Sequence, residues 1–162
     1  MQKIPKTIYQ AARFSTDLKQ EPVAELMHIS VESLRAYESG VTIPPADIVI
    51  MMIETYCTPW LAYQHLKTST LVGEKYLPDI DFRDLPTSVL MLQKEMADTY
   101  AVNRDMIDVT CDGQIDAHEH TQWGKVTTEI KQLIGAGFSL LFAPVQKEKV
   151  TCTAMQMASR IK

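Results

Sequence analysis

Three features are missing from this sequence of 162 residues, and each absence excludes a class of protein. No stretch approaches the roughly 18 consecutive apolar residues that a membrane-spanning helix requires, so we expect no contact with a membrane. No targeting segment is visible, because Lys3 and Lys6 are not followed by an apolar stretch. The three cysteines are odd in number and form no CxxC pair, a pattern that favours reduced thiols over a disulfide framework. These absences predict a cytoplasmic protein.

The common motifs of catalysis are also absent. The sequence contains no glycine-rich phosphate loop, no nucleophile elbow and no Ser/His/Asp or Cys/His arrangement typical of nucleophilic catalysis. Cys111, His118 and His120 follow the spacing of no recognised zinc motif. We therefore expect neither an enzyme nor a protein with a cofactor or a metal centre.

The charge balance argues against a strong non-specific binder of nucleic acid. The formal net charge is −4, and the first 75 residues carry seven Lys and Arg against eight Asp and Glu. Hydrophobic residues make up 46% of the chain and charged residues 22%, as in an ordinary globular protein. Any contact with nucleic acid would therefore depend on a small local group of basic side chains.

The spacing of apolar residues predicts five short helices in residues 1–67, and hence an all-α domain. The first three are expected at residues 7–15, 20–27 and 31–38. Ser30 is suited to cap the third helix, and Gly40 is suited to the positive φ that ends it. The fourth helix is expected to open at Pro44–Pro45, and the fifth to run from Pro59 to Leu66.

The second half of the chain is predicted to form a helical hairpin. A polar segment at residues 68–85 is expected to be a linker. A long helix from Pro86 is expected to pack against a second helix at about residues 115–134. Its apolar stripe would consist of Val89, Leu92 or Gln93, Met96, Tyr100 and Met106–Ile107. The short apolar run 138–142 fits a helix or a strand. The helical domain would span residues 86–142, and residues 143–162 would form a tail.

The residues around the second and third expected helices form a pattern in which each member has a physical role. The segment LKQEPVAEL (residues 18–26) contains Ala24, which is small because two helices would cross there closely. Ile29 and Leu34 would fill the corner between the helices. This pattern resembles the XRE family of helix-turn-helix regulators, which includes Cro and the phage lysogeny repressors, over about residues 7–66. The resemblance implies a five-helix bundle whose third helix enters the major groove of DNA.

The same resemblance implies the positions that contact DNA. Gln20 corresponds to a phosphate contact, Ser30 and Arg35 to residues that cap the helix or hold the DNA backbone, and Thr42 to the following loop. The base-facing positions are Val31, Glu32, Ser33 and Ala36. Of these, Val31 and Ala36 offer only apolar contacts to thymine methyl groups, and Glu32 either accepts a hydrogen bond from cytosine or merely favours the helix dipole. The nearby positive charges would be Arg13, Lys19 and Arg35, with Lys3 and Lys6 as further candidates.

The resemblance implies a transcription regulator of bacterial or prophage genes, most simply a repressor that binds its operator in double-stranded DNA as a homodimer. The carboxy-terminal half is expected to dimerise, to act as a sensor or to bind a protein partner. The acidic balance and the few base-reading side chains favour an alternative, in which the helix-turn-helix is the scaffold of a protein-binding adaptor or an antitoxin-like module.

The acidic loop from Asp108 to Glu119 permits two interpretations. Its acids occupy positions one, five, nine and twelve of a calcium loop with Gly113 at position six, but Thr110 stands at position three and no second loop is present to pair with it. Alternatively, an Asp-Gly turn connects two helices, and Asp116 forms a capping box with Glu119. The capped turn is the preferred interpretation, and calcium binding is the alternative.

Overall fold

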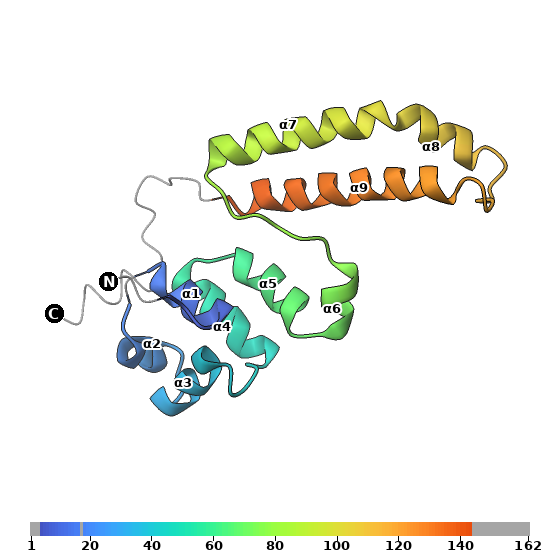
Figure 1. Cartoon of the computed structure of the whole chain (residues 1–162). Coiled ribbons are helices and arrows are strands. Elements are labelled where there is room, and N and C mark those ends of the chain that lie inside the picture. Colours follow the sequence, from blue (N-terminus) through green and yellow to red (C-terminus); the bar gives the residue numbers. More distant parts are fainter. Residues whose placement is uncertain (1–3, 17, 144–162) are drawn as a thin grey trace. The chain divides into compact units, whose positions relative to one another are not determined.

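The computed structural model describes residues 4–16 and 18–143 and is helical throughout its regular structure, with no strand in those residues. The all-α prediction is therefore confirmed. The described chain divides into two compact units between Leu77 and Pro78 (Figure 1). None of the helices in the described ranges is both long enough and apolar enough to cross a membrane.

The amino-terminal unit contains the five expected helices and one that the sequence did not predict. Each expected helix begins within about two residues of its predicted start, and those with a predicted end stop within about two residues of it. The helices are α1 (Ile8–Phe14), α2 (Gln20–Leu26), α3 (Val31–Ser39), α4 (Ala46–Tyr56), α5 (Trp60–Thr68) and α6 (Leu71–Tyr76).

The core of this unit lies where α1 to α5 meet. Met27, Leu34, Met52 and Leu61 have at most 1% of their surface exposed, and the burial of one such side chain contributes about 1.5–3 kcal/mol to stability. Ala24 is 1% exposed, which agrees with the close crossing expected between α2 and α3. These contacts hold α2 and α3 as one rigid pair.

The unexpected helix α6 lies in the segment predicted to be a linker. Thr70 caps it, because its side chain accepts a hydrogen bond from the backbone N–H of Gly73 at 2.9 Å. Gly73 is buried against α5 so closely that a Cβ atom built on it would lie 1.9 Å from the carbonyl oxygen of Leu66. A helix of this length has little stability alone, so contact with α5 must stabilise it.

We predict that Gly73→Ala destabilises the amino-terminal unit by about 1–3 kcal/mol, because the added methyl group collides with backbone that cannot easily move. Gly124→Ala is the matched control. Gly124 is also helical, but its added Cβ would have no neighbour within 4 Å, so this variant should be neutral or up to about 1 kcal/mol more stable. Thermal unfolding of both variants checks the prediction, and equal effects would contradict it.

The second unit is an antiparallel pair of long helices. The hairpin begins with α7 (Leu85–Ala101) and α8 (Asn103–Thr110), which are separated by Val102. Helix α9 (His120–Leu141) then returns beside them (Figure 1). Asp84 caps α7 by accepting a hydrogen bond from the N–H of Thr87 at 2.9 Å. The apolar run 138–142 is helical as far as Leu141, where α9 ends, so it is a helix and not a strand.

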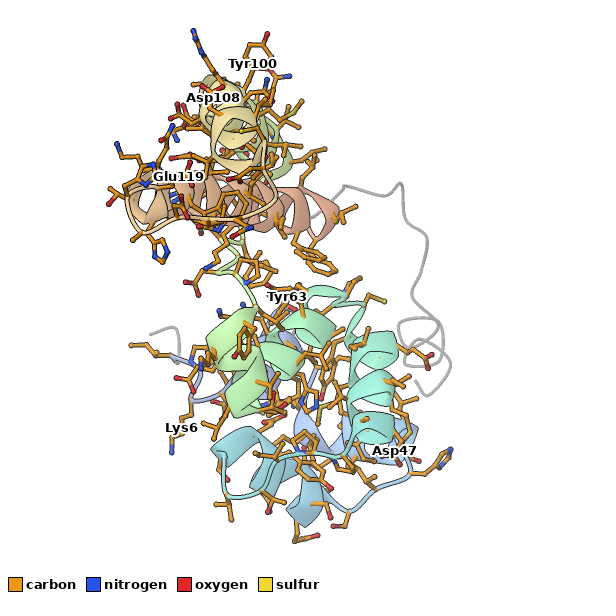
Figure 2. All side chains as sticks on the ribbon, turned by 90° about the vertical axis from the view of Figure 1, so that its right-hand side faces the viewer. Lys6, Asp47, Tyr63, Tyr100, Asp108 and Glu119 are labelled. Atoms are coloured by element: carbon orange, nitrogen blue, oxygen red, sulfur yellow. The ribbon has the colours of Figure 1, made fainter. Side chains whose placement is uncertain are left out.

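The predicted apolar stripe of α7 is wrong at Met96 and Tyr100, whereas Leu92 is half-buried. Tyr100 is 80% exposed and Met96 is 56% exposed, and Figure 2 shows the labelled Tyr100 at the surface of this unit. The buried positions of α7 are instead Ser88 and Glu95. The hydrophobic pattern favoured the larger side chains, but the two most buried side chains of α7 are polar.

The acidic turn between α8 and α9 has the hydrogen bonds of a capped turn. The Asp112 side chain accepts a hydrogen bond from the N–H of Gln114 at 3.0 Å, and Gly113 has a φ of 77°. The Glu119 carboxylate accepts from the N–H of Asp116 at 2.9 Å, which is one half of the predicted capping box. Helix α9 begins only at His120, so Asp116 does not itself cap the helix. Residues 144–162, including most of the predicted tail, lie outside the described residues.

Candidate nucleic-acid interface

The connection between α2 and α3 is a tight turn that sets the two helices at a fixed angle. The N–H of Ile29 donates to the carbonyl of Ala24 at 3.0 Å, and His28 adopts a left-handed conformation with a φ of 53°. Figure 1 shows α2 and α3 next to each other at the edge of the amino-terminal unit. The arrangement is a helix-turn-helix, and it presents α3 at the surface.

Local chemistry fixes both ends of α3. The Ser30 side chain accepts a hydrogen bond from the N–H of Ser33 at 3.0 Å, as predicted for an N-cap. Gly40 ends the helix with a φ of 78°, which costs glycine no steric strain. Leu34 is fully buried and anchors the inner side. The outer side of α3 is therefore held rigidly and stays accessible.

The predicted contact residues of α3 are brought together on that outer side. Ser30, Glu32 and Arg35 are exposed there and Ser33 and Ala36 are partly buried, whereas Val31 is partly buried because it packs against the core. Thr42 is exposed in the loop after α3, and its N–H donates to the carbonyl of Ala36 at 3.3 Å. Their roles on DNA remain predictions.

Below this surface lies a chain of hydrogen bonds that sequence reasoning missed. The Arg13 guanidinium donates from Nε to Glu38 Oε1 at 2.6 Å and from Nη2 to Glu38 Oε2 at 2.8 Å. Gln20 Nε2 also donates to Glu38 Oε2, at 2.8 Å. Arg35 Nε in turn donates to Gln20 Oε1 at 3.3 Å. This Arg13–Glu38–Gln20–Arg35 network connects α1, α2 and α3. The available signal was the position of Glu38, which lies one helical turn after the buried Leu34 and therefore on the same inner face of α3.

The predicted role of Arg13 as a charge near the duplex is therefore wrong. Arg13 is 8% exposed and Glu38 is 1% exposed, and the hydrogen bond to Glu38 raises the pKa of Arg13. The guanidinium neutralises a buried carboxylate instead of facing a phosphate. Both ends of the Gln20 amide are engaged within the unit, and its predicted contact with a phosphate stays a prediction.

The electrostatic character of the α2–α3 surface is mixed. Lys19 and Arg35 are the exposed cations on and next to these helices, whereas Glu21, Glu25 and Glu32 are exposed acids. Glu21 also approaches Arg35 at 3.9 Å, an exposed pair of small energetic weight. Two exposed cations thus stand against three exposed acids, so the α2–α3 surface is not the basic surface expected for DNA binding.

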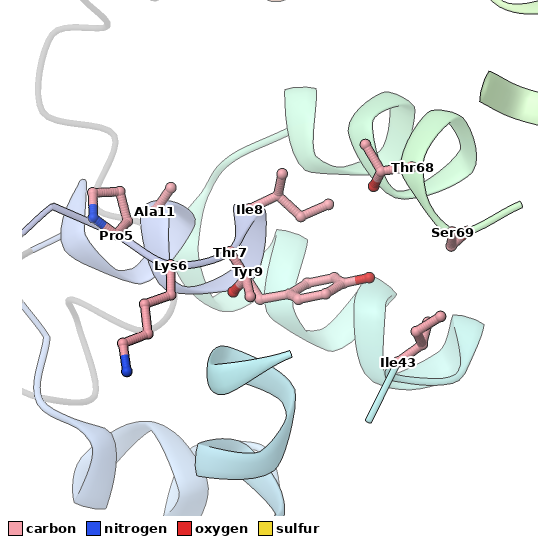
Figure 3. Close-up of a pocket in the computed structure, with 9 residues that line it drawn as sticks. All are labelled: Pro5, Lys6, Thr7, Ile8, Tyr9, Ala11, Ile43, Thr68 and Ser69. Atoms are coloured by element: carbon pink, nitrogen blue, oxygen red, sulfur yellow. The ribbon is translucent and has the colours of Figure 1, made fainter. Parts of the chain in front are cut away.

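A pocket of about 510 Å³ opens between α1, α5 and the loop after α3. Figure 3 shows Tyr9, Ile8 and Ile43 on its walls and Lys6 directed away from them. Behind the pocket, Tyr9 Oη is hydrogen-bonded to His65 Nδ1 at 2.9 Å. The lining is mainly apolar and contains no arrangement of catalytic groups, so the pocket suggests no reaction.

Burial lowers the pKa of His65, which leads to a prediction for pH dependence. As the pH falls below about 6.5, the unfolded chain takes up a proton that the folded chain resists. The amino-terminal unit should therefore lose stability from about pH 7.5 to about pH 5.5, and His65→Gln should reduce that loss. Melting temperatures of both proteins across this range provide the test. Identical pH profiles would show that His65 does not contribute.

Comparison with known proteins supports the helix-turn-helix interpretation. A family model described as Helix-turn-helix matches residues 10–56, which include most of α1 and all of α2, α3 and α4. No curated protein and no solved structure gave a match. The match covers the surface described above and leaves the second unit without a counterpart.

Proposed function

Because residues 10–56 form a helix-turn-helix domain of the XRE type, we propose that this protein is a sequence-specific regulator of transcription that acts as a repressor of bacterial or prophage genes. The observation that carries the proposal is the position of α3, which is capped by Ser30, anchored by Leu34 and exposed along its outer side. An α-helix is about 10–12 Å across, and the major groove of B-form DNA is about 12 Å wide.

In this proposal, two sets of residues divide the contacts with DNA. Val31, Glu32, Ser33 and Ala36 face the base edges, and Ser30, Arg35, Thr42 and Gln20 hold the sugar-phosphate backbone. Gln20 would act from within its network, and it would orient Arg35 toward a phosphate. Direct base recognition by so few polar groups is limited, so the shape of the operator would add specificity.

The small number of exposed cations near α3 supports a homodimer over a monomer. One protomer would neutralise few phosphates, so its affinity and salt dependence would be modest. Two protomers on half-sites about 34–36 Å apart would multiply their affinities. The second unit exposes several large apolar side chains, including Leu90, Tyr100 and Ile107, and exposed apolar surface is often covered in an interface. We assign dimerisation or sensing to this unit and a cytoplasmic location to the protein.

Selection of bound duplexes from a random oligonucleotide pool by the full chain is the direct test. A regulator should enrich one motif, a homodimer should enrich a near-palindrome, and repression should follow when that motif overlaps a promoter in a reporter assay. Enrichment of no sequence would contradict DNA recognition. Sedimentation velocity of the full chain tests the dimer, which a monomer at micromolar concentration would exclude.

One observation favours a second candidate function. With Arg13 buried, Glu21, Glu25 and Glu32 outnumber the exposed cations of the α2–α3 surface, and an acidic surface repels phosphates. A protein-binding adaptor or antitoxin-like module on the same scaffold would show this balance. The oligonucleotide selection separates the two functions, because an adaptor would enrich no motif.

A further inference from the structure

The helical hairpin contains one buried acidic side chain that hydrophobic packing does not explain, and two partly buried acids, Asp98 and Glu129, lie beside it. Glu95 on α7 is only 8% exposed, and its Oε2 atom is buried without a hydrogen-bond partner in the described residues. One oxygen each from Glu95, Asp98 and Glu129 lie within 4.8 Å of one another. A buried carboxylate oxygen without a partner is costly unless a cation or a proton neutralises it.

Lys94 supplies the only ion pairs to this acidic group within residues 4–16 and 18–143. Its Nζ donates to Asp98 Oδ2 at 2.7 Å and to Glu95 Oε1 at 2.9 Å, and these bonds raise the pKa of Lys94. Three carboxylates and one ammonium leave two negative charges. The Lys94 side chain is 65% exposed, so it can turn into solvent without disturbing the packing.

We propose that Glu95, Asp98 and Glu129 form a binding site for one divalent cation between α7 and α9. Carboxylate oxygens are the donors that Mg²⁺, Mn²⁺ and Ca²⁺ prefer. Glu95 and Asp98 are three residues apart and share one face of α7, and Glu129 joins them from the facing helix. The cation gives the buried Glu95 Oε2 its missing partner, takes the place of the Lys94 ammonium and links the two helices.

The second acidic group of the hairpin does not have these properties. Asp116, His118 and Glu119 also have potential ligand atoms within 4.8 Å of one another, but Asp116 and His118 are exposed. No buried oxygen without a partner lies among them, and the Glu119 carboxylate already accepts a hydrogen bond. This group therefore serves as the comparison for the site at Glu95.

The test is a calorimetric titration of the metal-free full chain with Mn²⁺, followed by competition with Mg²⁺ and Ca²⁺. One ion should bind per chain. Glu129→Gln should weaken binding by at least about tenfold, since it removes a charged ligand. Lys94→Gln should strengthen binding by about tenfold or more, because it removes the competing positive charge.

Two control variants separate this site from other acidic groups. Glu119→Gln removes a carboxylate from the acidic turn, and Lys131→Gln removes an exposed positive charge from α9; neither should change the affinity. The proposal is overturned if neither the natural chain nor Lys94→Gln binds the ion at millimolar concentration. It is also overturned if Glu119→Gln weakens binding and Glu129→Gln does not, or if Lys94→Gln fails to strengthen it. Misfolding cannot imitate stronger binding.

Discussion

Replacement of Glu38 by alanine is expected to lower the free energy of unfolding of the amino-terminal unit by about 3–5 kcal/mol. The change leaves the buried Arg13 guanidinium with the carbonyl of Leu18, at 2.7 Å, as its remaining acceptor. It also removes the ion pair that joins α1 to α3. Folded domains are stable by only about 5–15 kcal/mol, so this single change should consume much of the stability of the unit.

The two tryptophans allow this loss to be assigned to one unit. Trp60 lies in α5 and Trp123 in α9. In a Trp123→Phe background, tryptophan fluorescence followed during urea unfolding of the full chain therefore reports on the amino-terminal unit alone. The paired change Arg13→Met with Glu38→Leu should recover much of the loss, because it leaves no buried charge unpaired.

Glu21→Ala provides the surface control for the ion pair, because it lies in the same unit. Glu21 and Arg35 are 3.9 Å apart and both exposed, and the loss of such a pair should cost less than about 1 kcal/mol. If Glu38→Ala costs no more than this control, the buried pair does not hold α1 and α3 together.

Replacement of Arg35 by alanine is expected to weaken operator binding about 10- to 100-fold per protomer, the value of one charge-assisted hydrogen bond. Arg35 is an exposed cation on α3, and a phosphate contact carries no sequence information. The affinity should therefore fall on every operator variant by a similar factor. The slope of log affinity against log salt should decrease by about 0.9 for each protomer.

Fluorescence anisotropy with the selected operator at several salt concentrations measures both effects. Glu32→Gln should act in the opposite direction on non-specific DNA, because it removes an exposed negative charge from α3. Lys75→Ala removes an exposed cation from α6, away from α3 in the sequence, and should leave the affinity unchanged. An altered sequence preference in Arg35→Ala would mean that Arg35 contacts bases, and an unchanged affinity would mean that α3 does not face the DNA.

The amino-terminal helices were predictable because short-range chemistry sets their ends. Ser30 accepts from an N–H three residues later, and Gly40 adopts the left-handed conformation that glycine tolerates. Both features involve neighbours in the sequence and need no knowledge of the tertiary structure. The small size of Ala24 also gave the close crossing of α2 and α3 correctly.

The features that the sequence did not reveal all depend on distant partners. Arg13 and Glu38 are 25 positions apart, and each resembles a surface residue until the two are seen together. Helix α6 is too short to be predicted from propensity, and it exists because Gly73 packs on Leu66. The buried face of α7 was missed because Glu95 lies where a hydrophobic residue was expected. The DNA-contact assignments on α3 are still predictions, since they depend on a partner outside the chain.

The hydrogen bonds of the Gln20 amide lower the loss of side-chain entropy that binding a partner would cause. By bonding to Glu38 on one side and to Arg35 on the other, it restricts the rotamers of an arginine that would otherwise move freely in solvent. Ordering a long side chain upon binding costs about 0.5–1.5 kcal/mol. Part of this loss of conformational entropy is already incurred when the chain folds, so Arg35 meets its partner in a preorganised orientation.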